Sequence, residues 1–285
     1  MRILITGGTG YVGGHLIDVL LEQQDQIISL TRKPSKNAKI DYYQYNGDID
    51  KLNDIFNNFK PEGVIHLAAD INKTVCQKTI DNMVDTNIRL ISHLLELSKL
   101  HNIKRFINIS TYSLSIDGET YSPQTFYAAT KKAAEDLCEY YAMCKYFQVI
   151  SLNLYDVYGP NQPHARFLNS LIQSIENGAT FSMSKGEQEI CLIYVDEVVS
   201  GIVHCLKDLI VENYHEHFSL YGKEVFKLKQ LPDLIAGMLQ RKKIPVIYDK
   251  PYRPFEVMKF KPLHALPYGW QSSVRLSDKI HCLLR

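Results

Sequence analysis

Short runs of apolar residues alternate with stretches of helical periodicity along the first half of the chain. The short runs predict buried strands over Arg2–Thr6, Ile27–Leu30, Gly63–Leu67, Arg105–Ile109 and Gln148–Leu152. The stretches between them predict helices over His15–Glu22, Lys51–Phe59, Met83–Leu100 and Tyr127–Lys145. Because strands that alternate with helices are typical of βαβ units, we expect an α/β protein with a doubly wound, Rossmann-type parallel sheet.

The pattern changes near Gly159, where prolines begin to break the chain into short elements. This part predicts a smaller C-terminal lobe of loops and helices that binds substrate. Ile190–Leu206 repeats the strand-then-helix pattern of the first half, so we expect it to return to the main domain. The main domain is therefore expected to comprise residues 1–158 and about 189–210, and the second lobe residues 159–188 and 211–285.

Composition excludes several classes of protein. The chain has 285 residues, of which 45% are hydrophobic and 22% charged, so extended disorder is not expected. A net charge of +1 favours neither nucleic acid nor a membrane surface as a partner. The six cysteines are scattered without a C-x-x-C pair, which is typical of reduced thiols. With no apolar run of membrane-spanning length and no signal peptide before the first strand, we expect a cytoplasmic protein.

A glycine-rich turn follows the first strand and opens the first helix. Its G-x-x-G-x-x-G spacing permits a tight turn, lets a pyrophosphate approach the backbone, and lets helix pack on strand. Free N–H groups at the helix N-terminus then face the anion. A plain βα loop is the alternative, but the strand–turn–helix context favours dinucleotide binding. The expected cofactor contacts here are Gly7, Thr9, Gly10, Tyr11, Val12 and Gly13.

The end of the second strand predicts which dinucleotide binds. It reads Leu30-Thr31-Arg32-Lys33 and offers no acidic side chain to a ribose 2′-hydroxyl. Arg32 and Lys33 could instead neutralise a 2′-phosphate, so NADP(H) is favoured over NAD(H). A solvated basic turn is the alternative. Further along, Asp48 and Ile49 open the next helix, and Leu67-Ala68-Ala69 ends a strand with small residues across which a cofactor could lie.

Tyr127 and Lys131 form the strongest catalytic signal. Their spacing places both side chains on one face of a helix. A tyrosine with a pKa of about 10 exchanges protons poorly at neutral pH, and a neighbouring ammonium lowers that pKa. Ser110 and Thr111 end a strand at the same edge of the sheet. We expect Thr111 to hold the substrate oxygen, with Ser110 as the alternative, although either could simply form a turn.

Together these residues resemble the extended short-chain dehydrogenase/reductase family, which includes the NAD-dependent epimerases and dehydratases of nucleotide sugars. The shared motifs occur in the family order: Thr6–Gly13, Gly47-Asp48, His66–Ala69, Thr86-Asn87, Ile109–Thr111, Tyr127–Lys131, Tyr158–Pro160, Tyr194–Val198 and Gly269-Trp270. The resemblance implies that Tyr127 is the general acid/base and that Lys131 also holds the nicotinamide ribose. It implies cofactor contacts from Asn87 and Tyr155, and a homodimer through the helices Asp81–Leu100 and Tyr127–Lys145.

Departures from the family pattern narrow the expected activity. Thr111 is followed by Tyr112-Ser113, where 4,6-dehydratases have Asp-Glu, so dehydration is not expected. Asn153 and Ile190 stand where many UDP-sugar epimerases have arginines. The usual arginine contacts to a UDP or TDP diphosphate are therefore not expected here.

Three later segments resemble the CDP-abequose and CDP-paratose synthases more closely: Leu154–Pro160, Arg166–Asn169 and Met183–Gln188. This resemblance implies NADPH-dependent reduction of the 4-keto group of a CDP-deoxysugar for O-antigen synthesis. Asp156 would then face the sugar, or merely form a turn. Arg166 would bind the diphosphate, or lie on the surface.

Two other activities stay open. An NAD-dependent nucleotide-sugar epimerase would use the same tyrosine to oxidise and re-reduce one carbon. A non-catalytic NADP-binding regulatory protein would have no need to keep Thr111, Tyr127 and Lys131 together. No metal is expected, because His215 and His217 alternate in what we interpret as a polar loop without a third ligand.

Overall fold

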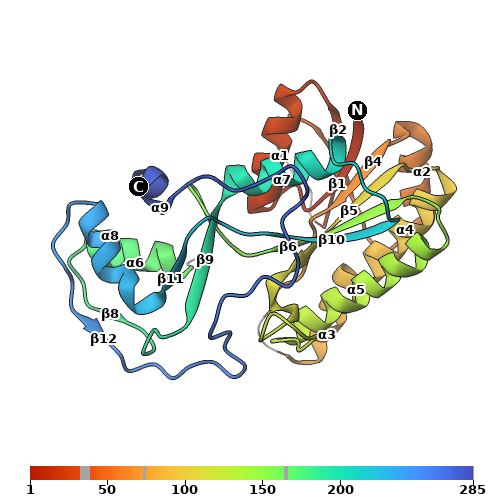
Figure 1. Ribbon diagram of the computed structural model, residues 1–285. Helices are drawn as coiled ribbons and strands as arrows, with labels where there is room; N and C mark the ends of the chain where they lie inside the picture. Colours follow the sequence, from red (N-terminus) through yellow and green to blue (C-terminus); the bar gives the residue numbers. More distant parts are fainter. Residues whose placement is uncertain (33–38, 73–74, 164–165, 285) are drawn as a thin grey trace.

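The computed structural model describes residues 1–32, 39–72, 75–163 and 166–284. Within them, a parallel sheet has the strand order β10-β6-β5-β4-β1-β2-β3 (Figure 1). Its strands are β1 Arg2–Thr6, β2 Gln26–Thr31, β3 Asp41–Gln44, β4 Gly63–His66, β5 Arg105–Thr111, β6 Gln148–Leu154 and β10 His215–Leu220. The order reverses between β1 and β4, which is where such folds bind ligands, at the carboxyl ends of the strands.

Helices cover both faces of this sheet. Alternate strand residues point to opposite faces, so Ile3 packs under α1 (Tyr11–Glu22) and α7 (Val195–Lys207), while Leu4 packs on the other side. The second face is covered by α2 Ile49–Phe59, α4 Leu90–Leu100 and α5 Phe126–Met143. Burial on both faces explains why the strands are almost continuously apolar in sequence.

A second group of elements packs around its own apolar core, beside the main sheet in Figure 1. It contains a three-stranded sheet of β7 Asp156–Tyr158, β9 Glu189–Tyr194 and β11 Val225–Lys227. The other elements here are α6 Phe167–Glu176, α8 Leu231–Met238, α9 Leu276–Lys279, the strand pair β8 Phe181–Ser182 and β12 Val246–Ile247, and short 3₁₀ turns at Leu228–Gln230 and Ile280–Leu283.

The predicted Rossmann-type fold is confirmed, and the five predicted strands are all present. The single helix expected over Met83–Leu100 is instead α3 (Gln77–Val84), a π-helical turn (Asp85–Arg89) and α4. A further 3₁₀ turn, Tyr112–Leu114, follows β5. Among the described residues, no helix combines the length and apolar character needed to cross a membrane.

The sequence interpretation was wrong about β10. The sequence predicts that residues 211–285 lie in the second lobe and that His215–His217 forms a loop, yet His215–Leu220 pairs with β6 in the main sheet. Its first half is polar and lacks the apolar run of a buried strand. Ile190–Leu206 is expected to lie wholly in the main domain, but only its helical half does. β9 joins the second sheet, while α7 packs on the main sheet. A two-lobed division of the chain therefore stays our proposal, with β10 moved to the main domain.

Candidate active site

The glycine turn is pressed against the end of β4. Gly7 has a φ of +76°, and a Cβ there would lie 2.8 Å from the Ala68 backbone nitrogen. A Cβ at Gly13 would lie 2.2 Å from the Gly7 carbonyl oxygen. Thr6 joins the two segments, because its Oγ1 accepts from the Ala68 N–H at 3.1 Å. The structure thus brings the predicted turn and the Leu67–Ala69 strand end together where the strand order reverses.

The first turn of α1 is suited to an anion. The helix starts after Gly10 with no side-chain cap and no acidic residue in its first turn. Its N–H groups are therefore left for a ligand, with the positive end of the helix dipole behind them. Thr9 and Gly10 are exposed and Tyr11 and Val12 half-buried, so the predicted residues line an accessible rim. This turn fits a dinucleotide pyrophosphate.

Asp70 faces Arg32, although no sequence motif signals it. Its carboxylate is mostly buried and lies 3.6 Å from the guanidinium of Arg32, the residue expected to select NADP. Lys33, the other predicted selectivity residue, lies outside the described residues. No motif signals Asp70, which simply follows the predicted strand end, so only the structure shows that Arg32 meets a negative charge.

Asn87 and Asp48 hold the segments around this rim. Asn87 is fully buried in the π-helical turn; its Oδ1 accepts from the Asp70 N–H at 2.8 Å and its Nδ2 donates to the Asp70 carbonyl at 3.1 Å. We therefore expect Asn87 to position this loop rather than to touch the cofactor. Asp48 caps α2 by accepting from two N–H groups of its first turn, directly before Ile49. Direct cofactor contact by Asp48 or Ile49 stays a prediction.

Thr111, Tyr127 and Lys131 come together at the end of β5. Thr125 caps α5 by accepting from the Ala128 N–H at 3.1 Å, which places Tyr127 in the first turn and Lys131 one turn later. The Thr111 hydroxyl hydrogen-bonds the Tyr127 phenol and lies 2.9 Å from the Ser113 hydroxyl.

Ser110, the alternative to Thr111, instead meets the Glu135 carboxyl group of α5. Glu135 lies about two turns beyond Tyr127 along α5, so the two hydroxyls meet different parts of that helix. The geometry favours Thr111.

Burial changes the proton affinity of both catalytic candidates. It raises the pKa of Tyr127 to about 12, against the opposing effects of the Thr111 hydrogen bond and the Arg166 charge. Burial lowers the pKa of Lys131 to about 8. The Lys131 side chain is fully buried, and its Nζ has no hydrogen-bond partner among the described residues. A buried ammonium without partners is costly, so this atom fits a ligand that brings hydroxyl groups, as a nicotinamide ribose does.

The predicted substrate residues Asp156 and Arg166 meet each other. Arg166 precedes α6, and its guanidinium lies 3.6 Å from the Asp156 carboxylate at the start of β7. Burial raises the pKa of Asp156, while Arg166 and a hydrogen bond with Tyr112 oppose that change. Arg166 also acts on the Tyr127 phenol. The pair therefore lies near Tyr127. Tyr112, which no sequence motif signals, is the third member of this group.

Tyr155, a predicted cofactor contact, lies in an aromatic cluster. Its buried ring stacks on Tyr112 at 5.1 Å between centroids, and its hydroxyl donates to the Lys261 carbonyl at 3.4 Å. Cofactor contact by Tyr155 stays a prediction.

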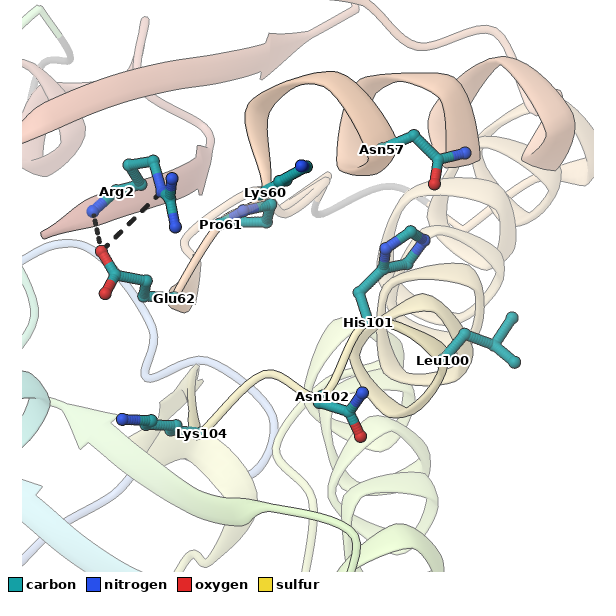
Figure 2. Close-up of a pocket in the computed structure, with 9 residues that line it drawn as sticks. All are labelled: Arg2, Asn57, Lys60, Pro61, Glu62, Leu100, His101, Asn102 and Lys104. Atoms are coloured by element: carbon teal, nitrogen blue, oxygen red, sulfur yellow. Dashed lines mark hydrogen bonds and ion pairs between the residues drawn. The ribbon is translucent and has the colours of Figure 1, made fainter.

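A hollow at the opposite edge of the main sheet is not this site. Figure 2 shows it beside Arg2 and Lys104, which stand at the amino ends of β1 and β5. Glu62 occupies one side and pairs with Arg2. Ligands of doubly wound sheets bind at the carboxyl ends, so we assign the hollow no role in catalysis.

Comparison with known proteins agrees with this geometry. Residues 3–220 match the model of the NAD dependent epimerase/dehydratase family. The chain is 28% identical over 238 residues to the CDP-abequose synthase of Yersinia pseudotuberculosis, covering 81% of this chain and 82% of that protein. Its structure superposes on the UDP-glucose 4-epimerase of Thermotoga maritima with a TM-score of 0.84 and 25% identity, over 99% and 96% of the two chains. The chain therefore belongs to the NAD dependent epimerase/dehydratase family, as its resemblance to the extended short-chain dehydrogenases/reductases predicted.

Proposed function

We propose that this protein is an NADPH-dependent reductase of the 4-keto group of a CDP-activated deoxysugar. The observation that carries the proposal is the Thr111–Tyr127–Lys131 arrangement, in which the half-buried Tyr127 phenol shares a hydrogen bond with Thr111 and the buried Lys131 ammonium lacks a partner among the described residues. The CDP-abequose synthase relative, which spans most of both chains, supports the substrate class.

The chain's residues fit a dinucleotide along the carboxyl edge of the sheet. The uncapped start of α1 and the close approach of Gly7 to Ala68 would hold the pyrophosphate. Lys131 would hold the ribose hydroxyls and gain the partners that its Nζ lacks. When bound, the reduced nicotinamide supplies the hydride that such a reduction needs.

Tyr127 would give its proton to the oxygen of the sugar's 4-keto group. Its raised pKa keeps the phenol protonated at neutral pH, which is the form that a reduction requires. Thr111 would donate a hydrogen bond to the same oxygen, where negative charge develops. The Lys131 ammonium would then stabilise the tyrosinate that remains.

Asp156 and Arg166 would meet the sugar nucleotide from the second lobe. The Arg166 side chain is partly exposed and presents a planar fork that suits a diphosphate. The Asp156 carboxylate pairs with the Arg166 guanidinium near Tyr127, and it would accept hydrogen bonds from the sugar hydroxyls.

An NAD-dependent nucleotide-sugar epimerase is the second candidate. It would use the same residues, and a specific observation favours it: Asp70 faces the Arg32 guanidinium, which reduces the positive charge available to a 2′-phosphate. The UDP-glucose 4-epimerase neighbour supports it as well. A non-catalytic NADP-binding protein is less supported, because nothing in such a role needs the hydrogen bond between Thr111 and Tyr127.

A labelled cofactor separates the two enzymes. With NADPH that carries deuterium at the transferred position, a reductase places deuterium on C4 of the product and consumes one NADPH for each sugar. An epimerase keeps its cofactor bound and transfers none of the added label. Deuterium-free product from an active preparation would therefore contradict the proposal.

The proposal includes a cytoplasmic homodimer. Large apolar side chains are exposed on and beside the α4 and α5 helices: Leu100, Tyr140, Met143 and Tyr146. Paired helices from two copies would cover them. Light scattering that gives the mass of one chain would contradict the dimer.

A further inference from the structure

His215 and His217 point to the same face of the main sheet. They are alternate residues of β10, and side chains two residues apart in a strand share a face. Their rings lie 4.1 Å apart between centroids. Pairing of β10 with β6 sets both residues beside α5, so they are not the loop residues that the sequence suggested.

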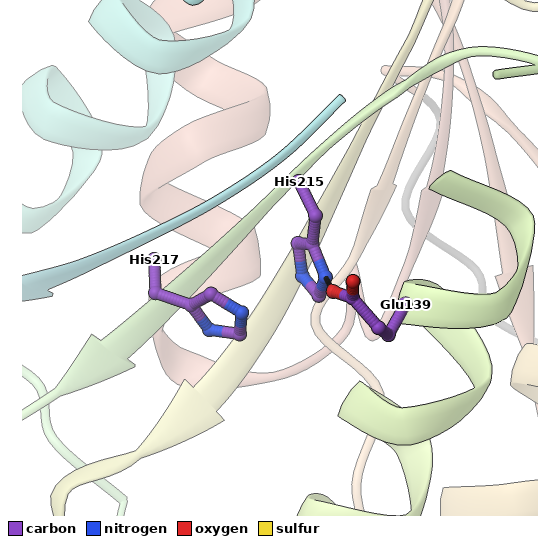
Figure 3. A group of neighbouring side chains, drawn as sticks. All are labelled: Glu139, His215 and His217. Carbon is purple, nitrogen blue, oxygen red and sulfur yellow. Dashed lines mark hydrogen bonds and ion pairs between the residues drawn. The ribbon is translucent and has the colours of Figure 1, made fainter. Parts of the chain in front are cut away.

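Glu139 of α5 completes a group of three possible metal ligands. Figure 3 shows its carboxylate beside the His215 ring, with the His217 ring next to them. The His215 Nδ1 lies 2.7 Å from the Glu139 Oε2. One ligand atom from each residue lies within 4.8 Å of the other two. Small side-chain rotations would bring these atoms to the separations found around a bound metal ion.

Two features of the surrounding groups point to a ligand. The Nε2 of the deeply buried His215 lies 3.0 Å from the Ser151 Oγ, which also accepts from the Asn108 Nδ2 at 3.2 Å. This contact fixes the His215 ring with Nδ1 toward Glu139, as a second hydrogen bond does for many metal-bound histidines. The buried Nδ1 of His217 has no hydrogen-bond partner within the described part of the chain.

The charge state of the group suits a cation. Glu139 contributes a negative charge to the group. Lys132 opposes a cation, but its ammonium lies 2.6 Å from the Asp136 carboxylate, which offsets its charge.

We propose that Glu139, His215 and His217 bind a divalent transition-metal ion, with zinc as the ion that two imidazoles and a carboxylate suit best. The half-exposed Glu139 leaves the fourth position open to water. The site lies about 18 Å along α5 from Tyr127, at 1.5 Å per residue. The metal therefore takes no part in the reaction and instead joins β10 to the helix that carries the catalytic tyrosine.

Zinc titration of untagged protein, after removal of metals with a chelator, tests the site. We expect one zinc ion per chain in competition with a coloured indicator, and a higher melting temperature with zinc. His217→Ala and Glu139→Gln should each weaken binding at least about tenfold. Cobalt in place of zinc should give the visible absorption of a four-coordinate ion.

His264→Ala is the matched control. Its ring lies 5.1 Å from the His217 ring between centroids, but His264 is not one of the three ligands, so zinc binding should stay within about twofold. Circular dichroism and dinucleotide binding check that each variant is folded. If His217→Ala does not fold, zinc binding by Glu139→Gln, a change on the helix surface, tests the site alone. Absence of saturable zinc binding, or binding that both ligand variants leave unchanged, would overturn the proposal.

Discussion

Asn87 hydrogen-bonds both backbone groups of Asp70: its Oδ1 accepts from the Asp70 N–H at 2.8 Å and its Nδ2 donates to the Asp70 carbonyl oxygen at 3.1 Å. This places the Asp70 carboxylate 3.6 Å from Arg32, at the edge where the adenosine half of a dinucleotide would bind. A residue expected to recognise a 2′-phosphate is thus partly neutralised by its neighbour.

Changing either member of this pair should shift coenzyme preference. Asp70→Asn keeps hydrogen-bonding atoms but removes the charge, so we expect it to favour NADPH over NADH by roughly two- to fivefold more than the wild type, within the range of an exposed ion pair. Arg32→Ala should shift the preference the other way. Calorimetric titration with both coenzymes measures the ratio. An unchanged ratio in Arg32→Ala would show that Arg32 does not meet the 2′-phosphate.

Tyr127→Phe should lower turnover by about 10²- to 10⁴-fold, because it removes the proton donor while keeping the ring. NADPH affinity should stay within about twofold. The matched control is Tyr140→Phe, an exposed tyrosine on the same helix, which should keep full activity. Loss of both turnover and NADPH binding in Tyr127→Phe would indicate a folding defect and leave its acid role unsupported.

Lys131 should make the stability of the cofactor-free protein depend on pH. Its pKa is about 8 in the folded chain and 10.5 at its ordinary value, so the unfolded state binds more protons between these limits. The contribution of Lys131 to the free energy of unfolding should therefore rise with pH from about pH 8 to about pH 10. Denaturant unfolding of wild type and Lys131→Met across this window measures the difference. Parallel curves for the two proteins would contradict the lowered pKa.

Arg166→Ala should weaken binding of the nucleotide sugar and leave binding of the cofactor unchanged. Loss of a charge-assisted hydrogen bond to a diphosphate predicts a KM about ten- to a hundredfold higher, with NADPH binding unchanged. Arg166→Lys should recover part of the loss. Arg241→Ala removes another surface arginine, which pairs with Glu176, and serves as the control. Equal KM values for Arg166→Ala and Arg241→Ala would exclude the diphosphate contact.

The sequence predicts those structural features that depend on residues close together in the chain. The glycine turn and the Tyr127–Lys131 pair depend on spacing within one element, and the buried strands depend on short apolar runs. The β10 strand was missed because His215–His217 faces other polar groups, so its burial leaves no apolar pattern. Asp70 and Tyr112 were missed because their roles arise from contacts with Arg32 and Asp156, which only the fold brings near.

Net consumption of NADPH in the presence of a CDP-4-keto-deoxysugar tests the central claim most directly. The near-ultraviolet absorbance of NADPH follows the reaction, and chromatography counts the sugar product. The account predicts that one NADPH is oxidised for each sugar reduced, and that Tyr127→Phe stops both. Interconversion of a nucleotide sugar by the wild type at constant NADPH absorbance would contradict the claim and identify an epimerase.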